Sequence, residues 1–527
     1  MSIYLGLDVS TQSLTAMLVE VAEHERRVVY EHAFRYDEAL PHYHTTHGVL
    51  RGPGAGVVSS PPVMWMEAID LMVARLARER PREMANLAAV AGSAQQHGSV
   101  YLDVRGMARL GRLDPAAPLA MQMANAFSRS VAPVWMDSST SSECREIAAA
   151  LGGDDVVTAR TGSKMFERFT GPQVRRFSKR EPRAYGATAR VHLVSSFLAS
   201  VLSGADAPVD PGDASGTNLM ELASSRWWPE ALEATAPGLS EKLPHIAPAT
   251  TIVGSLAPYW RERHGLPPAH AVIWSGDNPS SLIGTGLVRE GRLGISLGTS
   301  DTVFGLMRTP RTDVSMAGSV FGAPTGDFMG ITVFRNGSLA RERVRDQFGM
   351  SWQEFSAALR STPPGNGGAL MLPWFEPEIT PEVLSPSVHV RGLPAANAAA
   401  NIRAVVEGQM MSMANHSRWL GVDVHAIHAT GGASENPEVL QVIADVFGAD
   451  VYRFESTNSA CLGAAIRAFH ADRLAAGHPI SWDDAVAGLA EPQAQPIRPN
   501  PQHVALYRDL RKQYAAFEAE TIGKPLE

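Results

Sequence analysis

Two strand–loop–strand segments of the same design lie about half a chain apart, and they constrain the fold more than any other feature. The first, residues 3–21, alternates apolar residues up to Asp8, continues through a loop of small polar residues and resumes as an apolar strand. The second, residues 292–307, reads "RLGISLGTSDTVFGLM" and has the same order of strand, polar loop and strand. This repetition predicts an internal duplication.

The loops of both segments are suited to hold an anion. A strand, a short polar loop and an antiparallel return strand leave backbone N–H groups and hydroxyls directed into the bend. Taken alone, the first loop is more typical of a plain hairpin with a polar tip. The second copy favours binding, because two such hairpins facing one another can clasp a polyphosphate from both sides.

The sequence excludes the two common nucleotide-binding motifs. Its lysines are Lys164, Lys179, Lys242, Lys512 and Lys524, and none of them stands in the GxxxxGK[ST] frame of a P-loop. No GxGxxG lies between an expected strand and an expected helix.

Composition narrows the class of protein. The 527 residues have a net charge of -8, from 46 Lys and Arg against 54 Asp and Glu, which argues against a nucleic-acid partner. Two cysteines, Cys144 and Cys461, are too few for a disulfide framework, so we expect a reducing compartment. The start of the chain does not resemble a secretory signal, and no apolar run reaches the ~18 residues that a membrane helix needs. We therefore expect a cytoplasmic enzyme that binds no membrane.

A glycine turn follows a buried strand in the last third of the chain. Gly431 and Gly432 let the backbone approach a ligand closely, and Asn436 with Pro437 has the pattern of an N-cap that opens a helix over 437–447. A helix start beside a glycine turn suits a nucleotide. For Asn436, capping alone and ligand binding are equally good interpretations. A further helix starts at "SACLGAAIRAF", whose small residues allow tight helix packing: Ala460, Gly463 and Ala464.

"AVIWSGDNPSSLIGTG" places an acid at the end of a strand. Asn278 and Pro279 have the pattern of an N-cap and first residue of a helix, so Asp277 is not needed as the cap. An acid at the carboxyl end of a strand beside a helix start lies where α/β proteins place ligands. The pattern therefore favours Asp277 as a general base over a structural role.

Several short motifs, taken in order, resemble the FGGY carbohydrate kinases along nearly the whole chain. They are Asp8 with "STQS", "SAQQHGS" at 93–99, "VWMDSST" at 134–140, "SGDN" at 275–278, "SLGTSDT" at 296–302 and "TGGAS" at 430–434. Within that family the chain is most similar to the xylulose kinases, particularly the eukaryotic-type branch. Four segments carry this likeness: "VWMDSST", "ERFTG" at 167–171, "SGTNLM" at 215–220 and "TGGAS".

The resemblance implies an α/β fold of two actin-like, ribonuclease-H-type domains with an active-site cleft between them. Residues 1–286 would form the N-terminal domain, which binds the sugar and carries the base, and residues 287–527 the C-terminal domain, which binds ATP. The implied reaction is transfer of the ATP γ-phosphate to the terminal hydroxyl of a ketopentose, D-xylulose giving D-xylulose 5-phosphate, as in xylose metabolism.

The resemblance also assigns residues. Asp277 accepts the proton of the sugar hydroxyl, and Asp8 holds Mg²⁺ through water. Substrate contacts come from Gln96, His97, Trp135, Asp137, Arg168, Asp277 and Asn278, although core packing is an equal alternative for Trp135. ATP contacts come from Thr11, Gln12, Ser13, Gly298, Thr299, Ser300, Trp352, Gly431, Gly432, Ala433 and Asn436, with Trp352 packing against adenine.

Two rival functions stay open at this point. One is a kinase for another ketose or polyol, such as ribulose or glycerol, because pocket shape sets that choice and short motifs report it poorly. The other is a nucleotide-dependent switch of the actin and Hsp70 kind, which would share the two hairpins but needs no sugar base. Asp277, His97 and "VWMDSST" speak against the switch.

Overall fold

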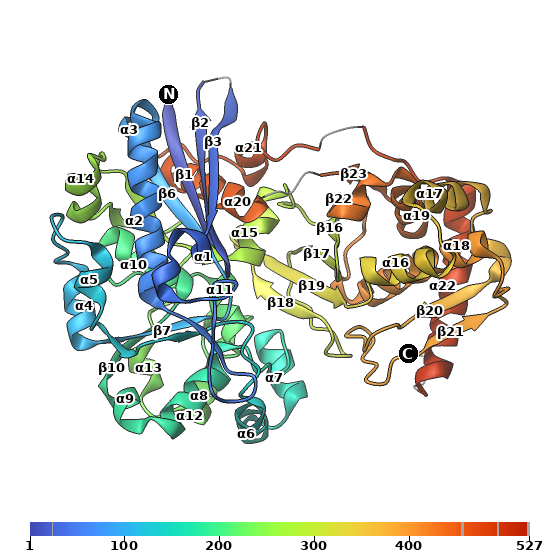
Figure 1. The fold of residues 1–527 in the computed structure, drawn as a ribbon, viewed down its shortest axis with the longest axis horizontal. Helices are drawn as coiled ribbons and strands as arrows, with labels where there is room; N and C mark the ends of the chain where they lie inside the picture. Colours follow the sequence, from blue (N-terminus) through green and yellow to red (C-terminus); the bar gives the residue numbers. More distant parts are fainter. Residues whose placement is uncertain (24, 455–457, 493–494, 524–527) are drawn as a thin grey trace. The chain divides into compact units, whose positions relative to one another are not determined.

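The computed structural model describes residues 1–23, 25–454, 458–492 and 495–523, and its contacts divide the chain into two compact units (Figure 1). Unit 1 comprises Met1–Val288, Val320–Phe328 and Asn458–Ala490. Unit 2 comprises Arg289–Ser319, Met329–Thr457 and Glu491–Glu527. The expected division at residues 286 and 287 is a single cut, whereas two later segments return to unit 1. The roles assigned to the two parts, sugar binding by residues 1–286 and ATP binding by residues 287–527, stay predictions.

Unit 1 is built on a seven-stranded mixed sheet in the order β13-β14-β6-β1-β2-β3, with β15 also paired to β6. β1 and β2 form the predicted antiparallel hairpin, while β1, β6 and β15 run parallel. Their carboxyl ends therefore meet at one edge, where ligands bind in α/β sheets. The strands are β1 (Ser2–Val9), β2 (Ser13–Val21), β3 (Arg26–Arg35), β6 (Leu87–Ala94), β13 (Ile252–Ser255), β14 (His270–Val272) and β15 (Ser275–Gly276).

Smaller sheets complete unit 1. Their strands are β4 (Leu50–Arg51), β5 (Val58–Ser60) and β9 (Ala132–Pro133); β7 (Ser99–Asp103), β8 (Phe127–Arg129) and β10 (Thr188–Leu193); and β11 (Met220–Glu221) with β12 (Arg226–Trp227).

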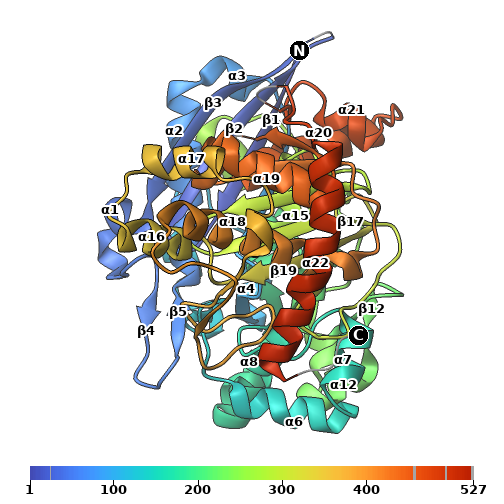
Figure 2. The same ribbon diagram turned by 90° about the vertical axis from the view of Figure 1, so that its right-hand side faces the viewer.

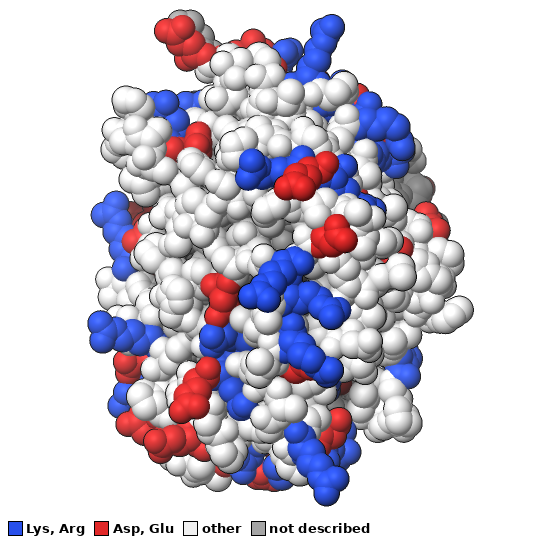
Figure 3. All heavy atoms as spheres, turned by 90° about the vertical axis from the view of Figure 1, so that its left-hand side faces the viewer, with Lys and Arg blue, Asp and Glu red and all other residues white. Residues whose placement is uncertain are grey.

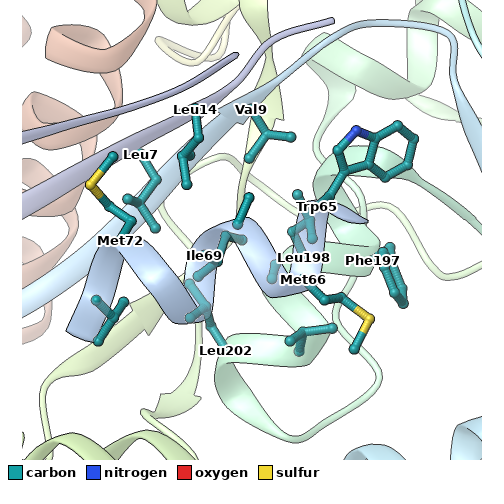
Figure 4. Packing of buried hydrophobic residues seen from close by; sticks show 14 of the residues in the cluster. Leu7, Val9, Leu14, Trp65, Met66, Ile69, Met72, Phe197, Leu198 and Leu202 are labelled. Carbon is teal, nitrogen blue, oxygen red and sulfur yellow. The ribbon is translucent and has the colours of Figure 1, made fainter. Parts of the chain in front are cut away.

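Helices cover the large sheet of unit 1. Leu7, Val9 and Leu14 of the first hairpin lie toward the apolar face of α2 and toward α10 in a fully buried cluster (Figure 4). The helices are α1 (Tyr36–Ala39), α2 (Pro62–Glu79), α3 (Pro81–Ala85), α4 (Val104–Leu110), α5 (Leu119–Met123), α6 (Ser141–Leu151), α7 (Asp154–Thr161), α8 (Thr170–Arg180), α9 (Pro182–Ala187), α10 (Val194–Ser203), α11 (Pro211–Ala214), α12 (Pro229–Thr235), α13 (Leu239–Lys242), α14 (Pro258–His264), α15 (Asp277–Gly284), α20 (Ser459–Ala475) and α21 (Trp482–Val486).

The helix that carries Asp277, α15, is in backbone contact with α20, which comes from much later in the chain. A Cβ atom on Gly284 would lie 1.9 Å from the Ser459 carbonyl oxygen, and one on Gly463 would lie 1.9 Å from that of Ser280. The prediction that small residues allow tight packing of α20 is confirmed.

A buried arginine fixes α20 on the sheet. Arg467 has 0% exposure and donates to the carbonyl oxygens of Gly92, Ala249 and Ile273 at 2.8–3.2 Å. Because Gly92 lies in β6 and Ile273 lies just before β15, α20 ties together the two strands that lead into the candidate site.

Unit 2 has its own mixed sheet, in which β19, β17, β16, β22 and β23 follow in that order. Its strands are β16 (Arg292–Leu297), β17 (Asp301–Met307), β19 (Phe328–Phe334), β20 (Leu370–Pro373), β21 (Val388–Arg391), β22 (Ala426–Thr430) and β23 (Asp450–Arg453), and β18 (Ser319–Gly322) falls largely in unit 1. Its helices are α16 (Ser338–Gln347), α17 (Trp352–Ser361), α18 (Ala398–His416), α19 (Pro437–Phe447) and α22 (Pro501–Ile522). Figure 2 faces this unit, with α22 in red running past α18 and α19.

The face of unit 1 drawn in Figure 3 carries charges of both signs. In Figure 3 basic and acidic side chains lie interspersed among uncharged ones, in agreement with surface ion pairs such as Arg75 with Glu79 and Arg263 with Asp70. Among the described helices, none has the length and apolar character that a membrane crossing requires.

The contact between α15 and α20 predicts that Gly463→Ala destabilises the protein. The added methyl group meets the backbone of Ser280, which cannot rotate away, so the free energy of unfolding should fall by about 1–3 kcal/mol or more. Chemical denaturation followed by circular dichroism measures this change.

Gly186→Ala is the matched control. Gly186 is an exposed residue of α9, and no heavy atom lies within 4 Å of the position its Cβ would take. Alanine in a helix is favoured over glycine by roughly 0.5–1 kcal/mol, so this variant should be as stable as the natural protein or more stable. Equal stability of both variants would contradict the backbone contact.

Candidate active site

The first hairpin loop is compact and partly self-bonded. The Ser10 N–H donates to the Ser13 carbonyl oxygen at 3.0 Å, and the two serine hydroxyls lie 2.9 Å apart. Gln12 is exposed at the tip, and the Thr11 hydroxyl accepts a hydrogen bond from the Trp135 indole Nε1–H at 2.7 Å. Thr11 keeps its own O–H to donate, as a phosphate contact requires.

That same hydrogen bond places Trp135 beside the hairpin loop. Its side chain is 46% exposed, so the alternative of core packing is wrong for this residue. Stacking of Trp135 on a sugar stays a prediction.

Asp8 ends β1 beside β6, where it is opposite Ser93. Its carboxylate oxygen Oδ1 is buried without a hydrogen-bond partner in the described structure. Burial raises the pKa of Asp8 to about 7, the Ser93 hydroxyl opposes the rise, and the nearby carboxylate of Asp277 adds to it. A charged Asp8 therefore lacks a compensating positive group.

These features fit a magnesium site with few protein ligands. Within the described residues there is no cluster of three or more His, Cys, Asp and Glu side chains able to hold a metal. An ion at Asp8 would therefore have fewer than three such ligands, and Mg²⁺ accepts such sites because it keeps several of its waters.

Asp277 is the first residue of α15, directly after β15. Its Oδ1 accepts hydrogen bonds from the Asn278 backbone N–H at 2.8 Å and from Asn278 Nδ2 at 3.1 Å. Burial raises the pKa of Asp277 to about 6, while backbone N–H groups of Asn278, Asp277 and Gln96 oppose the rise. A carboxylate with this pKa can accept a proton near neutral pH.

The prediction that Asn278 is the N-cap of this helix was wrong. The N-cap of α15 is Gly276, and Asn278 is already inside the helix. The reason is that the Asp277 carboxylate accepts the Asn278 N–H, while the Asn278 amide is drawn away to Gln96 Oε1 at 2.8 Å.

Gln96 and His97 are both buried and both held by the backbone around α11. Gln96 Nε2 donates to the Gly212 carbonyl oxygen at 3.2 Å, so Gln96 bridges this segment to Asn278. His97 Nδ1 donates to the Gly216 carbonyl oxygen at 2.7 Å. This bond fixes the tautomer and leaves Nε2 as an acceptor for a hydroxyl group.

Two neighbours keep His97 neutral and oriented. Its ring stacks on Phe169 with centroids 4.2 Å apart. Burial, with a further contribution from the positive charge of Arg168, lowers the pKa of His97 to about 3. A neutral, fixed imidazole suits a binding role better than proton transfer.

Arg168 lies half-buried over the ring of Phe166, with its guanidinium carbon 4.5 Å from the ring centroid. In the part of the chain that the structure describes, no oxygen atom accepts a hydrogen bond from this guanidinium. Its donors are therefore free for a polar ligand near His97.

Asp137 is buried and fully bonded within unit 1. Its oxygens accept from the Val58 and Ser139 backbone N–H groups, the Ser139 hydroxyl and Gln173 Nε2 at 2.6–2.9 Å. These bonds hold the loop that carries Trp135. A direct substrate contact by Asp137 stays a prediction.

The second hairpin, in unit 2, confirms the predicted repeat of architecture. β16 and β17 pair antiparallel around an exposed turn at Thr299 and Ser300, and the Ser338 N–H of α16 donates to the Gly298 carbonyl oxygen at 2.8 Å. Asp301 forms a fully buried ion pair with Arg341. The acid of this hairpin is thus structural, unlike Asp8.

The glycine turn of unit 2 follows β22 as expected. Gly431 has a φ of +84°, and a Cβ there would lie 2.5 Å from the Leu297 carbonyl oxygen of the second hairpin. Gly432 and Ala433 then open a short 3-10 helix, Gly432–Glu435, and no heavy atom lies within 4 Å of where a Gly432 Cβ would be. The turn is packed on one side and open on the other.

Asn436 both caps α19 and contacts α17. Its side-chain oxygen accepts the Glu438 N–H at 3.0 Å, and its Nδ2 donates to the Ser356 hydroxyl at 2.9 Å. Trp352 is the first residue of α17, is 45% exposed and lies 4.3 Å below the guanidinium carbon of Arg345. Asn436 and Trp352 therefore lie on adjoining helices, with the indole available for stacking.

Sequence reasoning missed three buried groups beside the site. Asp213 accepts a hydrogen bond from the Ser195 hydroxyl, and burial raises its pKa well above the ordinary range. Phe169 stacks on His97, and Gln95 has a buried amide without partners. Two of the three had a visible signal, since Gln95 stands beside Gln96 in "SAQQHGS" and Phe169 follows Arg168 in "ERFTG".

Sequence models of one family match most of the chain. The N-terminal domain of the FGGY family of carbohydrate kinases matches residues 129–284, and the C-terminal domain of the same family matches residues 293–471.

Individual proteins are similar over nearly the full length. A Mus musculus protein named xylulose kinase is 39% identical, with 99% of this chain and 96% of the relative covered, and an Arabidopsis thaliana protein named xylulose kinase 2 is 40% identical, with 89% and 87% covered. The crystal structure of a xylulose kinase from Rhodospirillum rubrum superposes with a TM-score of 0.82 at 19% identity over 98% of each chain. The predicted α/β fold with two sheet-centred, actin-like parts is confirmed.

Proposed function

The chain belongs to the FGGY family of carbohydrate kinases, and we propose that it transfers the γ-phosphate of ATP to the terminal hydroxyl of D-xylulose, giving D-xylulose 5-phosphate and ADP. The observation that carries the proposal is Asp277, a carboxylate with a raised pKa at the carboxyl end of β15. The relatives named xylulose kinase supply the choice of sugar.

Asp277 acts as the general base in this proposal. Asn278 binds Oδ1 twice and so fixes the carboxylate plane, while Oδ2 takes the proton of the sugar hydroxyl. As the sugar oxygen bonds to the γ-phosphorus, the bond from that phosphorus to the β-γ bridging oxygen breaks and ADP leaves. Positioning and charge neutralisation are most of what such a transfer needs.

The sugar is held by His97, Arg168 and Asn278. His97 Nε2 accepts from a sugar hydroxyl, because its Nδ1 is bonded to Gly216, and the unpaired Arg168 guanidinium donates to sugar oxygens. Gln96, Trp135 and Asp137 complete the proposed substrate contacts. In this division of roles, residues 1–286 bind the sugar.

Most of the proposed ATP contacts come from residues of the second part, 287–527. The open side of Gly431, Gly432 and Ala433 receives the nucleotide, with Asn436 beside it and Trp352 against adenine. The remaining contacts are to phosphate oxygens, from Gly298, Thr299 and Ser300 and from Thr11, Gln12 and Ser13 of the first hairpin.

Asp8 is the proposed holder of Mg²⁺, since its Oδ1 is buried and unpaired. When bound, the ion neutralises charge that builds on the phosphate oxygens during transfer. A cytoplasmic location belongs to the same proposal and is compatible with two cysteines that form no disulfide.

The choice of substrate is tested by a coupled assay of ADP release over a panel of ketoses and polyols. D-xylulose is expected to give the highest kcat/KM, because the segments most similar to xylulose kinases, "VWMDSST" and "ERFTG", provide Trp135 and Arg168. A clear preference for ribulose or glycerol would contradict the proposal.

Removal of the base is the second test. Asp277→Asn keeps the size of the side chain and the acceptor for the Asn278 N–H, so the protein should fold and its Tm should change little. An amide cannot take the proton, and kcat should fall by about 10²- to 10⁴-fold. Affinity for D-xylulose, measured by calorimetry, should change far less.

The pH profile checks the same residue independently. At saturating Mg²⁺, which keeps Asp8 ionised, Asp277 is the carboxylate that must be unprotonated to act. Because its pKa is raised to about 6, kcat/KM should fall tenfold for each pH unit below 6. This acid limb should disappear in Asp277→Asn. Retained turnover in the variant, or an unchanged acid limb, would show that Asp277 is structural.

A further inference from the structure

Gln95 has a buried side chain whose polar atoms are both unused. Its exposure is 1%, and neither Oε1 nor Nε2 has a hydrogen-bond partner among the described residues. Buried amides are nearly always hydrogen-bonded in folded proteins, so an unpaired one indicates a partner from outside the chain. Its neighbour Gln96 shows the contrast, since both of its polar atoms are bonded to Gly212 and Asn278.

The backbone places Gln95 on the same side of the sheet as Asp8. β1 and β6 run parallel with Asp8 opposite Ser93, and the Gln95 N–H continues this ladder by donating to the Val9 carbonyl oxygen at 3.0 Å. Side chains alternate along an extended chain, so Ser93 of β6 and Gln95, the first residue after β6, lie on one face and share it with Asp8.

The three side chains present oxygen atoms to the same region. Asp8 Oδ1 and both polar atoms of the Gln95 amide are buried without hydrogen-bond partners in the described structure, and the Ser93 hydroxyl lies beside the Asp8 carboxylate. A carboxylate, a hydroxyl and an amide oxygen are the hard oxygen donors that a hydrated magnesium ion prefers. A hydrated cation offers only O–H donors, which match these acceptors.

We propose that Gln95 is a positioning residue for the divalent cation at Asp8, accepting a hydrogen bond at Oε1 from a water of the metal. The proposal rests on the proposed function, because that function places the cation at Asp8. Gln95 Nε2 then donates to an oxygen of the phosphate that the cation carries, and Ser93 Oγ accepts from a second metal-bound water.

The test compares Gln95→Met with Gln96→Met. Both remove an amide at nearly constant volume, but only Gln96 has partners within the chain. Binding of Mn²⁺ in the presence of ADP, without ATP, is followed by the electron paramagnetic resonance signal of free Mn²⁺. Partners of metal-bound ligands typically change metal affinity by about 10- to 100-fold, so the Mn²⁺ dissociation constant of Gln95→Met should rise by at least about tenfold.

The metal-free Tm supplies a readout that does not depend on turnover. Gln95→Met should keep the Tm of the natural protein or raise it, because the variant no longer buries an unpaired amide. Gln96→Met should lower it, because Asn278 and Gly212 lose their partner. An unchanged Mn²⁺ dissociation constant, or a Tm loss as large as that of Gln96→Met, would overturn the proposal.

If Gln95→Met does not fold, a second variant tests whether Gln95 positions the cation at Asp8. Gln95→Glu keeps the size and adds a charged acceptor, so Mn²⁺ measured without nucleotide, where the lost Nε2 donor has no phosphate to bind, should bind more tightly. Unchanged or weaker binding under that condition would overturn the assignment. These outcomes are separate from failure of the proposed function, which would appear as the wrong sugar preference while the Mn²⁺ result for Gln95 stands.

Discussion

The backbone contact between α15 and α20 is the constraint on which the candidate site depends. Glycines at 284 and 463 allow the two helices to touch, and Arg467 of α20 is bonded to carbonyl oxygens on the strands leading to the site. A segment near the end of the chain thereby fixes the start of α15, where Asp277 lies. Since the proposed base must lie within hydrogen-bond reach of its proton, the proposal links the stability of this contact to the chemistry.

A second feature of the candidate site is that the carboxyl groups of Asp8 and Asp277 are both buried. Asp8 and Asp277 lie close enough that the charge of Asp277 contributes to the raised pKa of Asp8, and burial is the larger cause for both. A buried carboxylate without a cation is unfavourable. In the proposed mechanism a divalent ion would remove that cost at Asp8, while Asp277 stays able to take a proton. The acid of the second hairpin needs no metal ion, because the buried Asp301 carboxylate is paired with Arg341 of the same chain.

Much of this arrangement could be predicted from the sequence. Alternating apolar residues predicted both hairpins, and the Asn436-Pro437 pair predicted the start of α19, because these signals act within a few residues. The cap of α15 was wrong, since the Asn278 amide is drawn to Gln96, 182 positions away. The contacts of His97 with Gly216 and Phe169 could not be predicted either, because such contacts depend on tertiary packing. A single sequence also cannot show that the Gln95 amide is left without partners while that of Gln96 is bonded.

The central claim is that one carboxylate, Asp8, carries the metal while the sugar is bound by other residues. The most direct measurement is therefore Asp8→Ala, assayed for Mg²⁺-dependent transfer and, separately, for D-xylulose binding by calorimetry. The account predicts that kcat falls by at least about 10²-fold even at high Mg²⁺, because the phosphate charge is no longer neutralised, while D-xylulose still binds. Near-normal transfer in Asp8→Ala would contradict it, since another group would then hold the ion.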